Sequence, residues 1–131
     1  MSGAAVAAAA RALVGVRFRL HGRDPAHGLD CVGVVAAALR AGGWSGEVPS
    51  GYALRGGDLA WIAALLDAGL KRADGASAGD VVLVEAGPAQ WHLAVRIDGG
   101  VVHADAGLRR VVERPGAPAW PVRGAWRIGE G

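Results

Sequence analysis

The chain has 131 residues, which is enough for one domain with a buried core, so we predict a single domain over residues 1–131. Hydrophobic residues make up 52% of the chain and charged residues 20%, a composition that excludes a disordered protein. The net charge is only +2, and the arginines are scattered, with no run of basic residues that alternates with aromatic ones, so we expect no nucleic-acid partner.

Cysteine content and hydropathy further limit the classes of protein to which the chain can belong. Cys31 is the single cysteine, which excludes an internal disulfide and a zinc site built from several cysteines. We expect no metal and no other cofactor. No apolar stretch reaches about 18 residues, so we also expect no membrane span.

The first predicted element is an alanine-rich helix over residues 2–14, ending near Gly15. Residues 4–10 could be mistaken for a secretion signal, but they lack a basic beginning and a strongly hydrophobic centre. We therefore expect no Sec signal and a protein that is made in the cytoplasm.

The second predicted helix begins at the cysteine. Residues 16–29 contain turn residues and predict an irregular stretch. Residues 31–41 then repeat apolar side chains at helical spacing, with the buried positions Val32, Val35, Ala36 and Leu39. Asp30 stands where an N-cap belongs, and Gly42-Gly43 supplies the stop.

Further along, the chain changes from helical to strand-like spacing. Residues 44–57 predict a loop, residues 58–70 a third helix capped by Asp58, and residues 73–79 a polar turn. The apolar face of the third helix is predicted to hold Leu59, Ile62, Leu65 and Leu66. Short apolar or alternating segments then predict strands over residues 81–84, 91–97, 101–104, 108–113 and 122–128, the last at an edge. Helices followed by an antiparallel sheet define an α+β domain.

Cys31 lies in the first turn of its predicted helix. The free backbone N–H groups and the helix dipole at that end favour negative charge, so we expect a stabilised thiolate. The same N–H groups are suited to hold an oxyanion beside the sulfur.

Two histidines are predicted to meet on one hairpin. Asp98-Gly99 is a strong signal for a two-residue turn, which would place Ala94 opposite His103. His92 then shares a face with His103, with Cα atoms roughly 7–8 Å apart. This spacing suits a base and the residue that orients it, whereas a three-residue loop would put the two on opposite faces.

Several motifs resemble the NlpC family of cell-wall cysteine peptidases. They are Gly15-Val-Arg-Phe-Arg-Leu-His-Gly22, Leu29-Asp-Cys-Val-Gly-Val-Val35, Gly79-Asp-Val-Val-Leu-Val84, His92-Leu-Ala-Val95 and Val101-Val-His-Ala104, in the family's order. The likeness covers residues 8–127. It implies a papain-like fold with N-terminal helices packed on a small antiparallel sheet.

The resemblance also implies roles. Cys31 matches the nucleophile, His92 the general base and His103 the residue that orients His92. The substrate would be a peptidoglycan stem peptide, cut between D-γ-glutamate and a diamino acid. The short chain looks most like the branch carried by phage tails or gene transfer agents, whose particle proteins would be partners and would bring it to the periplasm or cell wall.

We expect Phe18, Asp30 and His21 to line the substrate groove, with Asp30 acting as a cap or loop brace rather than a catalytic acid. Two departures from the family pattern are Phe18, where tyrosine is common, and Val32, where serine usually follows the cysteine. Neither removes the proposed triad.

Three other interpretations stay open. The chain could be a catalytically silent module of a tail or wall assembly. The same cysteine and histidine could serve an amidase or acyltransferase, because such a pair does not select its acyl substrate. A zinc centre including His21, His27 and Cys31 is chemically allowed, but the spacing matches no familiar pattern.

Overall fold

The computed structural model describes residues 2–46, 59–88 and 90–129. The helices are α1 (Gly3–Ala12), α2 (Cys31–Ala41) and α3 (Leu59–Gly69). The strands are β1 (Arg23–Asp24), β2 (Gly28–Leu29), β3 (Lys71–Arg72), β4 (Val81–Gly87), β5 (Gln90–Ile97), β6 (Gly100–Asp105), β7 (Arg110–Pro115) and β8 (Val122–Arg127). Strands β3-β8-β4-β5-β6-β7 form one antiparallel sheet in that order, so the predicted α+β class is confirmed.

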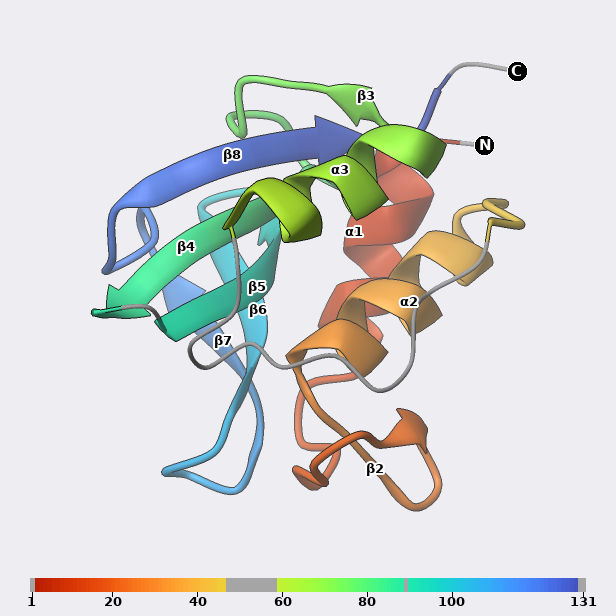
Figure 1. Cartoon of the computed structure of the whole chain (residues 1–131). Helices are drawn as coiled ribbons and strands as arrows, with labels where there is room; N and C mark the ends of the chain where they lie inside the picture. Colours follow the sequence, from red (N-terminus) through yellow and green to blue (C-terminus); the bar gives the residue numbers. More distant parts are fainter. Residues whose placement is uncertain (1, 47–58, 89, 130–131) are drawn as a thin grey trace.

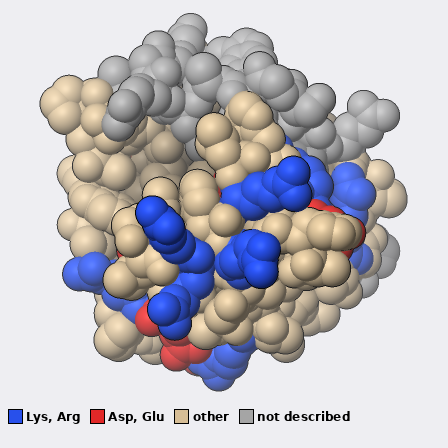
Figure 2. Space-filling view, turned by 90° about the horizontal axis from the view of Figure 1, so that it is seen from below, with Lys and Arg blue, Asp and Glu red and all other residues tan. Residues whose placement is uncertain are grey.

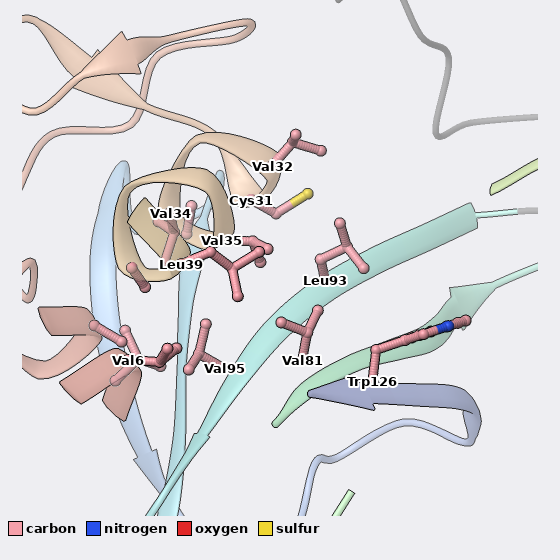
Figure 3. Close-up of a cluster of buried hydrophobic side chains, with 14 of the residues drawn as sticks. Val6, Cys31, Val32, Val34, Val35, Leu39, Val81, Leu93, Val95 and Trp126 are labelled. Carbon is pink, nitrogen blue, oxygen red and sulfur yellow. The ribbon is translucent and has the colours of Figure 1, made fainter. Parts of the chain in front are cut away.

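The core lies between the helices and one face of this sheet (Figure 1). Helices α1 and α2 pack against each other and against β5, and α3 contacts β8. Figure 3 shows the apolar layer, in which Val6 of α1, Leu39 of α2 and Val95 of β5 are almost fully buried. Each fully buried aliphatic side chain of this kind stabilises the fold by about 1.5–3 kcal/mol relative to an exposed one.

Both N-terminal helices begin where the sequence predicts. The Ser2 hydroxyl accepts a hydrogen bond from the Ala5 N–H at 3.1 Å, and the Asp30 carboxylate accepts one from the Gly33 N–H at 2.8 Å. Helix α2 is buried on more than the one face predicted, since Val34 and Ala38 are fully buried as well. The reason is that α1, β1 and β5 surround it, a tertiary arrangement that periodicity alone does not reveal.

The hairpin between β5 and β6 has the predicted register. Ile97 pairs with Gly100 and Arg96 with Val101, which is the arrangement of a two-residue turn at Asp98-Gly99. Gly99 has φ +76°, a conformation that glycine adopts without the Cβ penalty of other residues.

Three local predictions are wrong or incomplete. Strand β8 is not at an edge: it lies between β3 and β4, because the unpredicted strand β3 pairs with its far side. The β1–β2 hairpin within residues 16–29 was likewise not predicted. Leu65 is 37% exposed rather than core-facing, since Ile62 occupies the buried face of α3. Asp58 and most of the predicted loop 44–57 lie outside the described residues.

The other face of the sheet is covered too. A second, smaller apolar cluster is formed there by Val82, Val84, Ala94, Val101 and Ala125. Trp120, from the segment between β7 and β8, packs against it. Among the described residues, no helix is both long and apolar enough to cross a membrane.

Candidate active site

The six residues predicted for the site meet at one cavity of about 690 Å³. They are Cys31, His92 and His103, predicted as the triad, and Phe18, Asp30 and His21, predicted for the substrate groove. The rest of the lining is Leu20, Ala86, Gln90, Trp91, Ala104, Asp105, Ala106, Gly107 and Trp120. Segments far apart in the sequence therefore form this cavity: the loop after α1, the start of α2, the start of β5 and the end of β6.

Cys31 is the first residue of α2 and points toward β5 (Figure 3). Cys31 is only 5% exposed, and the backbone N–H groups of Leu93 and Val32 donate hydrogen bonds to its sulfur. Because Leu93 directly follows His92 in the chain, its hydrogen bond holds the sulfur beside the part of β5 that carries His92. Position and surroundings therefore suit a nucleophile that is shielded from water.

The expected stabilised thiolate is not found in this structure. Burial of the sulfur raises the pKa of Cys31 to about 12, more than the backbone hydrogen bonds lower it. The nearby charge of Asp30 raises the pKa further, and Arg23 lowers it slightly. Since desolvation outweighs the helix N-terminus, the thiol is neutral at pH 7.

The two histidines form a hydrogen-bonded pair. Nε2 of His92 lies 2.9 Å from Nδ1 of His103, and the rings meet edge to face with centroids 5.0 Å apart. The predicted proximity of the two side chains is confirmed. Because Nε2 of His92 faces His103, Nδ1 is the nitrogen of His92 that is left for another partner.

Both rings are neutral at pH 7. The pKa of His92 is lowered to about 4, chiefly by desolvation and next by the repulsion that a protonated His103 would exert, while Asp105 and Asp30 raise it. Desolvation likewise lowers the pKa of His103, against the opposing effect of Asp105. A neutral His103 can accept at Nδ1, which leaves the His92 Nε2–H as donor and the His92 Nδ1 lone pair free to take a proton.

Trp120 completes the surroundings of the histidines and was missed in the sequence. Its ring meets both imidazoles edge to face, with centroids 5.8 Å from His92 and 6.1 Å from His103. The indole therefore shields the pair from water and limits their rotation. The sequence placed it only in an irregular proline-rich segment, and no pattern there indicates a contact with residues 92 and 103.

Asp30 braces the loop beside the nucleophile. Its carboxylate caps α2, accepts the backbone N–H of His21 at 2.9 Å and forms an ion pair with Arg23 at 2.8 Å. The side chain is almost fully buried and touches the cavity. The residue thus ties the loop 21–23 to the helix that carries Cys31.

Phe18 and His21 shape the wall of the cavity opposite the strands. The backbone N–H of Phe18 donates to the Arg109 carbonyl at 2.9 Å, and its ring packs against the main core. His21 has φ +60°, in the left-handed region, and its N–H is fixed by Asp30. His27 does not line this cavity; its imidazole pairs with Asp24 at the surface.

The described residues contain no group of three histidine, cysteine or acidic side chains placed to hold a metal ion. His21 and Cys31 share the cavity, but His27 lies apart from them. The arrangement thus supplies a thiol, a neutral base and an orienting acceptor for chemistry on an acyl group.

Comparison with solved structures identifies the fold. NlpC1 and NlpC2 from Trichomonas vaginalis superpose with TM-scores of 0.74 at 16% and 14% identity, each over 96% of this chain. The chain spans only 44% and 46% of those two proteins. The NlpC/p60 domain of the peptidoglycan hydrolase SagA superposes with a TM-score of 0.66 at 22% identity, over 98% of this chain and 100% of that domain. The protein therefore has the papain-like fold of NlpC/p60 domains.

Sequence comparison adds nothing to this assignment: no family model matches the chain, and no match is found among curated proteins. The fold is thus established by the structure, and the activity has to be argued from the site.

Proposed function

We propose that this protein is a cysteine peptidase that hydrolyses peptidoglycan stem peptides. One observation carries the proposal: Cys31 at the start of α2 and the His92–His103 pair line the same cavity in an NlpC/p60 fold. A nucleophile, a base and a residue that orients the base are the parts that acyl transfer by a thiol requires.

In the proposed reaction, the thiol proton of Cys31 moves to Nδ1 of His92 as the sulfur attacks the carbonyl carbon of the substrate. The carbonyl oxygen becomes an oxyanion near the start of α2, where the helix dipole favours negative charge. The tetrahedral intermediate then breaks its C–N bond, and the amine leaves with the proton from His92. Water, deprotonated by His92, hydrolyses the thioester and restores the thiol.

Burial of Cys31 and His92 determines when the proton is transferred in this reaction. With a thiol pKa of about 12 and a His92 pKa of about 4, the neutral pair predominates over the thiolate–imidazolium pair at pH 7. Proton transfer therefore accompanies attack instead of preceding it. His103 supports the transfer by accepting from Nε2 of His92 and so stabilising the imidazolium that forms.

We place the cleaved bond between D-γ-glutamate and a diamino acid, as the resemblance of the motifs implies. SagA, which shares the fold, is named a peptidoglycan hydrolase. We further propose that the enzyme reaches the wall on a phage-tail or gene-transfer-agent particle. This last step rests only on the motif resemblance.

The deciding experiment is mass spectrometry of purified stem peptides containing L-Ala-γ-D-Glu-diaminopimelate, incubated with wild type and with Cys31→Ala. Cleavage by wild type alone would support the peptidase and identify the bond. If neither protein cleaves and wild type also forms no thioester with an activated ester such as p-nitrophenyl acetate, the chain is a silent structural module. Thioester formation by wild type without cleavage of the stem peptide would instead favour an amidase or acyltransferase on another substrate.

A further inference from the structure

An arginine cluster lies directly beside the candidate active site. Its four members are Arg17, Arg19, Arg109 and Arg110, and all four are exposed. Figure 2 shows basic side chains gathered on the face that carries the β1–β2 hairpin and the turn between β6 and β7, with few acidic side chains among them. We call these four residues the arginine rim.

Backbone pairing holds the rim together. Arg17 is directly opposite Arg110 in an antiparallel bridge, and the Arg109 carbonyl accepts the N–H of Phe18 at 2.9 Å. The side chains of Arg17 and Arg19 both flank Gly28, where an added Cβ would lie 3.0 Å and 2.7 Å from their Cγ and Cβ atoms. Charges from two distant chain segments are thus fixed side by side.

The like charges of the rim are not neutralised within the described part of the chain. None of the four guanidinium groups forms an ion pair with a described acid. Asp105 stands opposite Arg110 in the ladder, but its Oδ1 accepts the Leu108 N–H instead. Like charges directly opposite each other destabilise a strand pair. An arrangement that is locally unfavourable in this way marks a candidate functional surface.

The rim adjoins the cavity. Phe18 and Leu20 line the cavity, and Arg17 and Arg19 alternate with them along the chain, so the two arginine side chains lie on the other face of this segment, the face that meets Arg110. Asp105 and Gly107 line the cavity on the other side, just before Arg109 and Arg110. A polymer that lies on the rim would therefore contact two of the chain segments that line the cavity.

We propose that the arginine rim binds the carboxylates of the murein polymer, and so holds the wall while a stem peptide enters the cavity. This inference rests on the proposed function. Several exposed charges spread over about 10 Å suit a chain of repeating carboxylates better than a single small anion, for which a closed pocket would be expected. The aromatic ring between these arginines, that of Phe18, packs against the core and lines the cavity, so it offers no stacking surface among the guanidinium groups, which disfavours a single-stranded nucleic acid.

The test measures wall binding separately from cleavage. Purified sacculi stripped of phosphate polymers by hydrofluoric acid are pelleted with Cys31→Ala protein, with and without Arg17→Gln and Arg110→Gln. Glutamine keeps the first two methylenes and a polar amide in each side chain, but removes the guanidinium group and its charge. A matched control carries Arg40→Gln and Lys71→Gln, which are exposed, unpaired among described acids and remote from the cavity.

We expect the rim variant to bind sacculi roughly fivefold more weakly at low ionic strength, with the control unchanged. The difference should vanish above about 0.5 M salt, where the Debye length is only a few ångströms. Equal binding by the rim variant and its parent would overturn the proposal. So would binding that disappears once phosphate polymers are removed, or binding to phosphatidylglycerol vesicles in place of sacculi.

Cleavage of the soluble stem peptide by Cys31-containing protein distinguishes the two proposals. If no protein cleaves that peptide but the rim variant still loses sacculus binding, the proposed peptidase fails and the rim stands. If the soluble peptide is cleaved while all variants bind sacculi alike, the peptidase stands and the rim fails.

Discussion

The two sides of the cavity are built by different means. On the helix side, a polar network fixes the backbone: the Asp30 carboxylate caps α2, holds His21 and pairs with Arg23. On the strand side, a hydrogen bond joins His92 to His103, and Trp120 meets both rings in an edge-to-face arrangement.

The helix side of the cavity therefore fixes the position of the nucleophile, whereas the strand side sets the pKa values of the two histidines. The network around Asp30 consists of short, directional bonds to backbone groups, so it sets the position at which α2 begins. The histidine side relies on burial, which lowers the pKa values of both rings and keeps them neutral. Substitutions on the helix side should therefore act mainly on stability, and those on the strand side mainly on activity and its pH dependence.

The largest effect is expected from His92→Gln. Glutamine can still meet His103 but cannot take a proton from the thiol, so the rate of stem-peptide cleavage should fall by about 10³–10⁴-fold. The rate is followed by mass spectrometry of the peptide products. His27→Gln is the matched control, because His27 is exposed and lies outside the cavity. A loss of less than tenfold in His92→Gln would mean that another group is the base.

Acid should destabilise the fold through the strand side. His92 titrates near 4 in the fold and near 6.5 when unfolded, so the unfolded chain binds the proton first as the pH falls. Stability is full above pH 6.5 and should decline by about 3 kcal/mol as the pH falls to 4. Urea unfolding measured at pH 7, 5.5 and 4 checks this. The decline should be shallower in His92→Gln, and an equal slope in both proteins would assign it to other groups.

The sequence predicted the parts that depend on local pattern. Asp30 followed by a cysteine and an apolar repeat located the start of α2, and Asp98-Gly99 set the register that brings the two histidines together. Each of these signals lies within a few residues of the structure that it predicts.

What the sequence did not predict depends on contacts between distant segments. Trp120 lies 17 residues after His103, in a segment without periodicity, and meets it only through the packing of the sheet. The pKa of Cys31 was expected to be low because the helix start favours a thiolate, yet tertiary burial raises it to about 12. Strand β8 became an interior strand because Lys71 and Arg72 pair with it.

On the helix side, Asp30→Asn should reduce the free energy of unfolding by about 2 kcal/mol. Asparagine still caps a helix, but it gives up the charge that pairs with Arg23 and weakens the bond from the His21 N–H. Urea denaturation at pH 7 measures the change. Asp98→Asn is the control, since it alters the same charge at the exposed hairpin turn and should change stability by less than about 0.5 kcal/mol. Equal effects in the two variants would show that the network does not brace the helix.

The smallest effect is expected from Trp120→Leu, which tests whether Trp120 changes the pKa of His92 or only packs against it. Trp120→Leu removes the aromatic edge from both imidazoles and admits water, so kcat/KM for stem peptides should fall by about tenfold, or about 1.4 kcal/mol. Better hydration should also raise the pKa of His92 from about 4 toward 6.5. Because the base works in its neutral form, the acid limb of the pH profile of kcat/KM should then move to higher pH.

Trp120→Phe keeps an aromatic edge and should retain most of both properties, so it serves as the conservative control. If Trp120→Leu lowers kcat/KM while its acid limb stays in place, Trp120 contributes only packing. If kcat/KM falls and its acid limb moves to higher pH in Trp120→Leu, and both are largely restored in Trp120→Phe, then Trp120 is the residue that positions the two histidines and excludes water from them. The strand side of the cavity would then owe its chemistry to a segment in which the sequence shows no pattern.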